Sequence, residues 1–256
     1  MEGAVARVTL NRPEQLNALN AELIEALTVF FTGLTERQDV RVVVLQAAGR
    51  TFCAGLDLKE AGGSPEPLKV SAGLDKQRRV RNIMLAMRRC PQPIVCVVQG
   101  AASGGGFALA LASDVRLATP DARMNAAFIR IGLSACDVGV SYFLPRMVGS
   151  SVAAELMLTG RFLGAQRALA LGLVSTVAPL DELQAEAQSL VNDMLNTSPL
   201  GLRLTKDVLN LSIDAASLDA VIALEDRNQI LCARTDDFPE GVRAFLEKRT
   251  PRYNDR

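Results

Sequence analysis

The chain has 256 residues, of which 49% are hydrophobic and 22% charged, and its 28 basic side chains balance 28 acidic ones. This composition is typical of a folded globular protein and argues against a disordered chain or a nucleic-acid-binding protein, so we expect neither nucleic acid nor a membrane as a partner. Histidine is absent, which excludes Ser-His-Asp and Cys-His catalysis and the commonest general base.

The first elements predict a strand, a helix and a second strand. Residues 5–10 alternate between apolar and polar side chains, as a half-buried strand does. Asn20 is a suitable N-cap for a helix over residues 21–37, whose apolar residues recur at helical spacing. Residues 40–47 form a β-branched apolar run, which indicates a strand covered on both faces.

A glycine-containing loop follows the second strand. Residues 48–60, AGRTFCAGLDLKE, read as this loop entering a short helix. Residues 61–73 mix Gly, Pro and Ser, which predicts a mobile surface loop, and residues 74–90 form a basic amphipathic helix.

The same pattern then repeats. Residues 92–100 predict a second buried strand, residues 101–106 (AASGGG) a second glycine loop, and residues 107–114 a second helix. Two units of strand, glycine loop and helix predict an α/β fold with right-handed connections.

The C-terminal part is expected to be helical. Residues 171–179 predict the last strand, and from Leu180 onward only helical periodicity remains. The Thr197-Ser198-Pro199 turn is a suitable boundary. We therefore predict an α/β core over residues 1–197 and a helical subdomain over residues 198–256 that packs against another subunit.

The N-terminus and the cysteines bear on the cellular compartment. The N-terminal residues lack the basic and apolar regions of a secretory signal, and no apolar segment is long enough to span a bilayer. Five cysteines without C-x-x-C spacing indicate free thiols rather than a disulfide framework or a zinc site. We expect a cytoplasmic protein without a bound metal, in which the cysteines are small buried residues.

Each glycine loop places free backbone N–H groups at the start of a helix, where negative charge is stabilised. Neither loop matches the G-x-G-x-x-G dinucleotide motif or the P-loop. Ser103 as a nucleophile would lack a histidine base. The loops therefore suggest an anion site, or else turns that need glycine for backbone reasons alone.

Five stretches resemble the crotonase superfamily, the enoyl-CoA hydratase/isomerase family. They are LNRPEQLNAL (10–19), TFCAGLDLKE (51–60), VQGAASGGGFALALASDVRLAT (98–119), ELMLTGRFLGAQRALALGLVSTV (155–177) and GVRAFLEKRTPRY (241–253). The resemblance implies a spiral of ββα repeats with a helical C-terminal trimerisation region. It also implies that the predicted core, residues 1–197, binds acyl-CoA. It also implies a homotrimer or a dimer of trimers, with coenzyme A present as part of the substrate thioester rather than as a cofactor.

The resemblance assigns roles to particular residues. The N–H groups of Leu56 and Gly105 would form an oxyanion hole for the thioester carbonyl, and one such donor is typically worth about 3–4 kcal/mol. The two glutamates of family hydratases fall on Ala108 and Phe128 here, and neither side chain can transfer a proton. The substrate-binding positions would be Gln15, Ala18, Cys53, Leu58, Gly104, Phe128 and Lys248.

Asp137 is the replacement base that the sequence offers. It resembles the aspartate of the dienoyl-CoA isomerase and dihydroxynaphthoyl-CoA synthase branches, and an apolar cleft would raise its pKa toward that of a useful base. Its alternative role is to cap the helix that follows, since Asp is a preferred N-cap residue. The neighbouring Cys136 is expected to be buried rather than to act as a nucleophile. Tyr142 is expected to pack in the core, with donation of a hydrogen bond as the alternative.

We expect an enzyme that isomerises an enoyl- or dienoyl-CoA double bond, with Asp137 as base. Hydration by non-standard acid and base residues is one alternative. A non-catalytic acyl-CoA-binding homologue is another. A serine peptidase of the related fold is opposed by the missing histidine.

Overall fold

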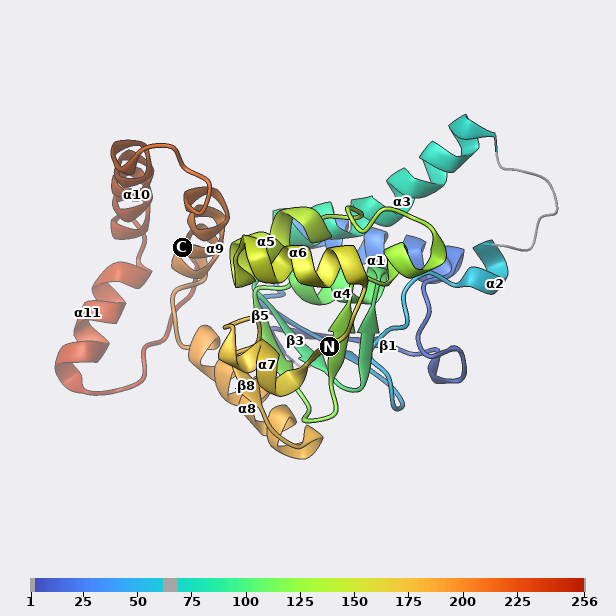
Figure 1. Cartoon of the computed structure of the whole chain (residues 1–256). Helices are drawn as coiled ribbons and strands as arrows, with labels where there is room; N and C mark the ends of the chain where they lie inside the picture. Colours follow the sequence, from blue (N-terminus) through green and yellow to red (C-terminus); the bar gives the residue numbers. More distant parts are fainter. Residues whose placement is uncertain (1–2, 62–68, 256) are drawn as a thin grey trace.

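The computed structural model describes residues 3–61 and 69–255, and a parallel sheet lies at its centre (Figure 1). Within the described residues this sheet has five strands in the order β1-β2-β3-β5-β8. The strands are β1 (Val5–Leu10), β2 (Val42–Ala47), β3 (Ile94–Val98), β5 (Val115–Ala118) and β8 (Thr176–Val177). The expected α/β fold is therefore confirmed, although the last strand is only two residues long rather than spanning 171–179.

A second, small sheet lies beside the first and carries one of the glycine loops. Its three strands follow the order β4-β6-β7, with β4 parallel to β6 and β6 antiparallel to β7. They are β4 (Ala101–Ser103), β6 (Arg123–Asn125) and β7 (Leu163–Gly164). The predicted second glycine loop thus begins as a short strand that pairs with β6, and Ala102 also forms an isolated bridge with Cys53.

Helices cover both faces of the main sheet, as the continuous apolar runs predict. On one face, α1 (Ala21–Gly33), α3 (Val70–Arg89) and α4 (Gly105–Ala112) share a hydrophobic core with β2 and β3. On the other, α8 (Leu180–Leu195) packs on apolar side chains of β2, β3 and β5. The predicted cap of α1 is confirmed: Asn20 Oδ1 accepts a hydrogen bond from the Leu23 N–H at 3.0 Å.

Both ends of the expected surface loop, residues 61–73, are helical. Residues 62–68 lie outside the described residues, whereas α3 already begins at Val70 and so takes in the last four residues of the expected loop. The remaining helices of the described core are α2 (Leu58–Ala61), α5 (Val140–Val148), α6 (Ser150–Thr159), α7 (Ala165–Ala170) and the short 3-10 helices Pro13–Gln15, Leu34–Glu36 and Ala127–Ile131.

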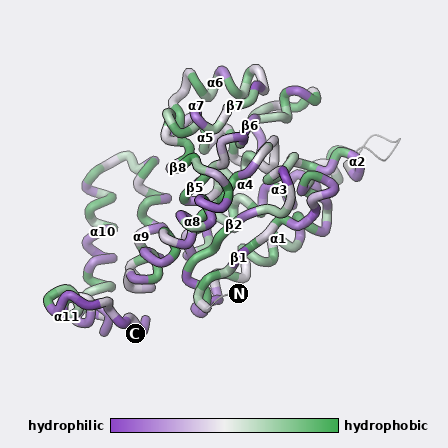
Figure 2. Tube along the Cα trace, turned by 90° about the horizontal axis from the view of Figure 1, so that it is seen from below, coloured by the Kyte–Doolittle hydropathy of each residue, from purple (hydrophilic) through white to green (hydrophobic). Residues whose placement is uncertain are grey.

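The C-terminal helices α9 (Pro199–Ser212), α10 (Leu218–Ala233) and α11 (Asp237–Glu247) stand to one side of the sheet (Figure 1). The all-helical C-terminus is confirmed, and Ser198 caps α9 by accepting the Gly201 N–H at 3.1 Å. Figure 2 shows hydrophobic segments on these outlying helices as well as in the interior. None of the described helices is long and apolar enough to cross a membrane.

Candidate active site

The structure brings the two glycine loops into direct contact. The Cys53 N–H donates to Ala101 O at 3.0 Å, and the Ser103 N–H donates back to Cys53 O at 2.9 Å. A Cβ on Gly106 would lie 2.3 Å from Cys53 O, closer than any side chain tolerates. Glycine at position 106 is therefore required for the loops to meet.

The amides of Leu56 and Gly105 lie where the loops converge. The Leu56 nitrogen is 4.0 Å from the point that a Cβ on Gly105 would occupy, and the Gly105 nitrogen is 3.5 Å from the corresponding point on Gly55. Among the described residues neither N–H donates a hydrogen bond. Gly105 is also the first residue of α4, so its N–H has no acceptor inside the helix and lies at the positive end of the helix dipole. Two free, adjacent donors are the arrangement that stabilises a developing oxyanion.

The two positions that hold glutamates in family hydratases carry buried apolar side chains in this structure. Ala108 is fully buried in α4. Phe128 is 8% exposed, and its ring carbon lies 3.4 Å from where a Cβ on Gly104 would be. Phe128 therefore covers the glycine triplet with an aromatic edge and supplies no proton.

Asp137 is not a helix cap. α5 begins at Val140 with Gly139 as its N-cap, and no side chain caps it. Asp137 Oδ1 instead accepts the N–H of Val138 at 2.8 Å and the side-chain amide of Gln77 in α3. The capping interpretation is wrong because the backbone turns through Val138 (φ 38°) and Gly139 (φ 93°) before the helix starts.

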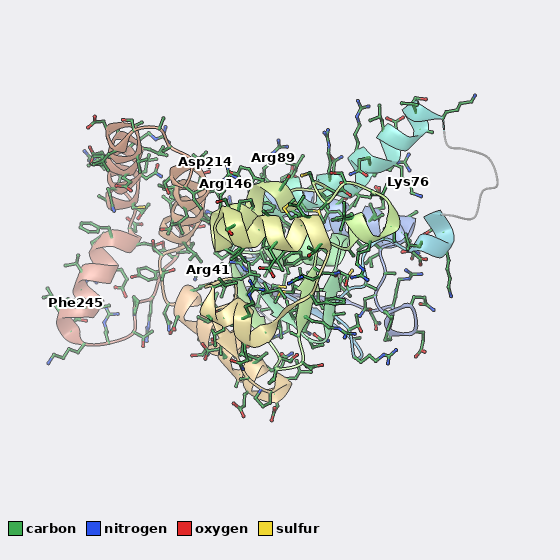
Figure 3. The ribbon with its side chains drawn as sticks, viewed as in Figure 1. Arg41, Lys76, Arg89, Arg146, Asp214 and Phe245 are labelled. Atoms are coloured by element: carbon green, nitrogen blue, oxygen red, sulfur yellow. The ribbon has the colours of Figure 1, made fainter. Side chains whose placement is uncertain are left out.

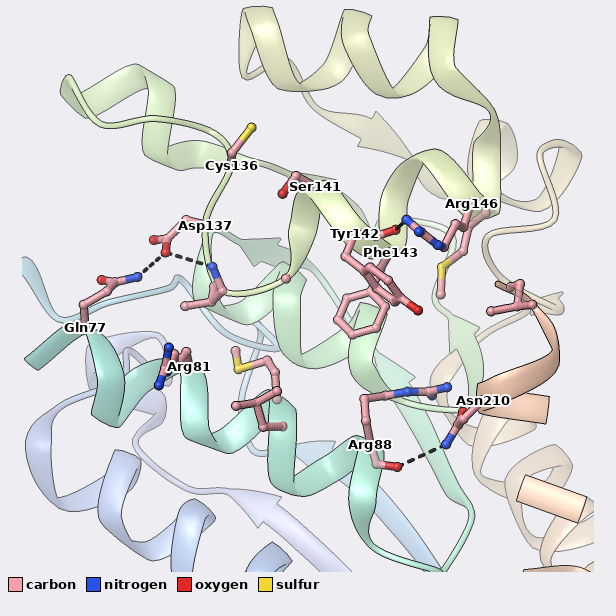
Figure 4. Close-up of a pocket in the computed structure, with 16 residues that line it drawn as sticks. Gln77, Arg81, Arg88, Cys136, Asp137, Ser141, Tyr142, Phe143, Arg146 and Asn210 are labelled. Atoms are coloured by element: carbon pink, nitrogen blue, oxygen red, sulfur yellow. Dashed lines mark hydrogen bonds between the residues drawn. The ribbon is translucent and has the colours of Figure 1, made fainter. Parts of the chain in front are cut away.

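Asp137 lines a cavity of about 570 Å³ between α3, α5 and the end of α9 (Figure 4). Burial raises the pKa of its carboxyl group above the ordinary value, while the hydrogen bonds from Val138 and Gln77 act in the opposite direction. A carboxylate with a raised pKa on the wall of a cavity is suited to accept a proton from carbon. The other lining residues include Arg81, Met84, Leu85, Arg88, Cys136, Ser141, Tyr142, Phe143, Arg146, Met147, Asn210 and Ile213.

Two residues that line this cavity, Tyr142 and Arg146, make polar contacts with the turn after α9. Asp214 accepts a hydrogen bond from Tyr142 Oη, and Arg146 Nε donates to its other oxygen at 2.8 Å (Figure 3). The Arg146 guanidinium also lies 3.8 Å from the centre of the Tyr142 ring. Tyr142 is 43% exposed, so the expectation that it packs in the core is wrong.

Leu56 lines a second cavity, of about 640 Å³, formed with α1 and the outer face of α3. Residues of α3 line both cavities, Lys76 and Arg79 on this one and Gln77 and Arg81 on the one with Asp137. Leu56 thus lies close to Gly105, and Phe128 lies close to Gly104. Asp137 lies in the neighbouring cavity.

The remaining predicted binding residues lie before α1, in and just after the first glycine loop, and at the C-terminus. Gln15 and Leu58 are exposed, whereas Ala18 and Cys53 are buried. Lys248 ends α11, on the opposite side of the molecule from α2 (Figure 1). Within one chain Lys248 is therefore remote from the glycine loops, and these contacts with coenzyme A remain predictions.

The structure also corrects the account of the cysteines. Cys53, Cys90 and Cys96 are buried as expected, but Cys136 is exposed and Cys232 is only half-buried. Burial raises the pKa of the Cys53 thiol to about 12. Cys136 follows an exposed segment, residues 129–134, and is itself exposed. Neither the spacing nor the composition of the sequence reveals that this segment lies on the surface.

Sequence reasoning missed the contribution of α3. Gln77, Arg81, Met84, Leu85 and Arg88 all line the Asp137 cavity. Their spacing of three, four and seven residues places them on one stripe of the helix, which is a detectable signal. That this stripe faces a cavity rather than solvent follows only from the tertiary structure.

Comparisons with known proteins identify the family of the chain. The family model for enoyl-CoA hydratase/isomerase matches residues 1–256. The probable enoyl-CoA hydratase EchA12 of Mycobacterium tuberculosis H37Rv is 39% identical over 255 residues, covering 98% of this chain and 90% of the relative. The 1,2-epoxyphenylacetyl-CoA isomerase of Escherichia coli K12 is 34% identical, covering 99% and 96%. The crystal structure of an enoyl-CoA hydratase from Bacillus anthracis superposes with a TM-score of 0.93 at 33% identity, covering 99% of this chain and 96% of that one.

Proposed function

Because the chain belongs to the enoyl-CoA hydratase/isomerase family, we propose that it shifts a double bond in an enoyl- or dienoyl-CoA thioester. The N–H groups of Leu56 and Gly105 would hold the thioester oxygen, and Asp137 would act as the base. Relatives of this chain include both hydratases and an isomerase by name, so the choice of reaction rests on the side chains.

The proposed reaction needs one base and no bound water. The Asp137 carboxylate removes a proton from the carbon next to the thioester carbonyl, and the negative charge moves to the carbonyl oxygen. The two backbone donors stabilise this enolate, each by about 3–4 kcal/mol. With a 3-enoyl thioester, the protonated Asp137 then returns the proton two carbons further along the chain, so the double bond moves and no atom is gained or lost.

The observation that carries the choice of isomerase is the apolar surface at positions 108 and 128. A hydratase must hold and activate a water molecule, and losing one positioned acid or base typically forfeits about 10²–10⁴-fold in rate. Ala108 and Phe128 can do neither. A proton shuttle needs only donors for the oxyanion and one base, the roles proposed for the two free amides and for Asp137.

The substitution Asp137→Asn tests the base. It keeps the size of the side chain and its ability to accept the Val138 N–H, so the loop is expected to remain folded. We expect kcat for isomerisation to fall by about 10²–10⁴-fold, with the affinity for coenzyme A thioesters, measured by isothermal titration, unchanged. A variant with full activity and unchanged affinity would show that another group is the base.

A further inference from the structure

We propose that Gln77 is a positioning residue for Asp137: it occupies one carboxylate oxygen, Oδ1, and thereby assigns proton transfer to the other, Oδ2. This inference rests on the proposed role of Asp137 as the base. It adds a residue from a distant part of the chain and names the atom that accepts the proton.

The hydrogen bonds of Asp137 are distributed unequally between its two oxygens. Oδ1 accepts both the Gln77 side-chain amide and the Val138 N–H, the latter at 2.8 Å. Oδ2 has no hydrogen-bond partner among the described residues. Figure 4 shows both dashed lines meeting at one oxygen of Asp137. An oxygen that already accepts two hydrogen bonds has little capacity for a proton, so Oδ2 is the reactive one.

The backbone around Asp137 is held firmly, and the Gln77 amide acts with the Val138 N–H to orient its side chain. Val138 is a buried β-branched residue with a φ of 38°, a conformation that is costly unless the surroundings enforce it. The Val140 N–H fixes the turn by donating to Asp137 O at 2.8 Å. Among the described residues, Gln77 makes the only side-chain hydrogen bond that links the carboxylate to another element, α3, sixty residues earlier in the chain.

The other charged and titratable groups around this cavity are engaged elsewhere or make no contact with Asp137. From α3, Arg88 pairs with Asp114 at 3.0 Å, and Arg81 lines the cavity. From α5, Tyr142 and Arg146 both bind Asp214. Cys136 precedes Asp137 on the loop and is exposed.

A neutral donor is chemically suited to this position. A lysine or arginine beside the carboxylate would lower its pKa by about 1–3 units and weaken it as a base. A carboxamide fixes the orientation of the carboxylate and has a smaller effect on its pKa. Burial raises the pKa of Asp137 while the Gln77 hydrogen bond lowers it, so removing Gln77 raises that pKa further. Because the base must be ionised, activity rises with pH through this pKa, and its acid limb then moves to higher pH.

The test is the pH profile of kcat/KM for isomerisation of a 3-enoyl-CoA by the whole protein, comparing wild type with Gln77→Ala and Gln77→Glu. We expect Gln77→Ala to lower kcat by about 10- to 100-fold through misplacement of the carboxylate, to change KM less, and to shift the acid limb to higher pH. Gln77→Glu removes the donor and adds a negative charge, so its acid limb should move further in the same direction.

The matched control is Arg78→Ala, the neighbouring residue on α3. Arg78 is exposed and pairs with Asp75 on the surface, so its loss should leave both kcat and the pH profile unchanged. If Asp137→Asn is inactive but both Gln77 variants keep the wild-type kcat and acid limb, the positioning role is wrong and the base assignment stands. If Asp137→Asn is itself active, the base assignment and this inference both fail.

Discussion

At the scale of single residues, Gly106 decides whether the two glycine loops can meet. A methyl group at this position would lie 2.3 Å from Cys53 O and 2.7 Å from Cys53 Cβ. We predict that Gly106→Ala destabilises the protein by about 1–3 kcal/mol, the usual cost of overpacking a core, and separates the Leu56 and Gly105 amides so that activity is lost. Urea unfolding monitored by circular dichroism measures the first effect and turnover of an enoyl-CoA the second.

Gly73→Ala is the control for this substitution. Gly73 lies in α3 with no heavy atom within 4 Å of its added Cβ. Alanine there should raise stability by about 0.5–1 kcal/mol, because glycine is unfavourable within a helix. Equal stability of the two variants would contradict the packing account of Gly106.

Residue identity alone predicted part of the site. The motifs placed Leu56, Gly105 and Asp137, and the first two do lie together. The two roles considered for Asp137 could not be distinguished in sequence, because an aspartate near a helix start has the same spacing whether it caps the helix or not. Val138 has a positive φ, which the local sequence does not predict, so the helix begins only at Val140. The Asp137 side chain therefore does not cap the helix.

At the scale of elements, Lys206 anchors α9 to the α/β core. It is 4% exposed, and its Nζ donates to Gln92 O at 2.7 Å and pairs with Asp114 Oδ2 at 2.9 Å. We predict that Lys206→Met lowers the free energy of unfolding by about 3 kcal/mol, near the lower end for a broken buried ion pair, because Arg88 still pairs with Asp114. Chemical denaturation provides the measurement.

The control is Lys69→Met, at an exposed position before α3. Surface substitutions of this kind usually change stability by less than about 0.5 kcal/mol. If Lys206→Met were as stable as Lys69→Met, the ion pair with Asp114 would not anchor α9. Because Asn210 and Ile213 of the same region line the Asp137 cavity, a loosened α9 should also weaken acyl-CoA binding.

Long periodic elements were predictable, and short ones were not. The continuous apolar runs of β2 and β3 and the helical pattern of α1 appear in the structure as expected. β4, β7 and β8 are two or three residues long, and such strands exist only because a neighbouring strand supplies the hydrogen bonds. Pairing across Cys53 and Ala102 cannot be deduced from the local pattern of either segment.

At the scale of the whole molecule, the C-terminal helices expose many apolar side chains. Phe245, labelled in Figure 3, is 83% exposed, and its neighbour Leu246 is 74% exposed. Surfaces of this kind usually mark interfaces. The other exposed apolar residues of this region are Leu209, Leu211, Ile213, Leu218, Ile222, Ile230, Leu231, Phe238 and Val242. We propose that they pack against other copies of the chain in a homotrimer or a dimer of trimers, in which Lys248 would reach coenzyme A on a neighbour.

Light scattering after size-exclusion chromatography tests this assembly. We predict a mass of three or six times the 27.4 kDa of one chain, and a smaller species for Phe245→Glu. Val29→Glu is the control, because Val29 is 60% exposed on α1, away from the C-terminal helices. A wild-type mass of 27.4 kDa at all concentrations would contradict the proposed oligomer.

The most direct test of the central claim is mass spectrometry of acyl-CoA thioesters incubated with the protein in heavy water. Wild type and Asp137→Asn would each be given saturated, 2-enoyl, 3-enoyl and dienoyl thioesters. We predict that wild type incorporates deuterium at carbon in step with a shift of the double bond in an enoyl or dienoyl thioester, and that Asp137→Asn does not. A mass gain of one water would instead identify a hydratase, and no exchange in any thioester, with coenzyme A binding intact, would identify a non-catalytic binding protein.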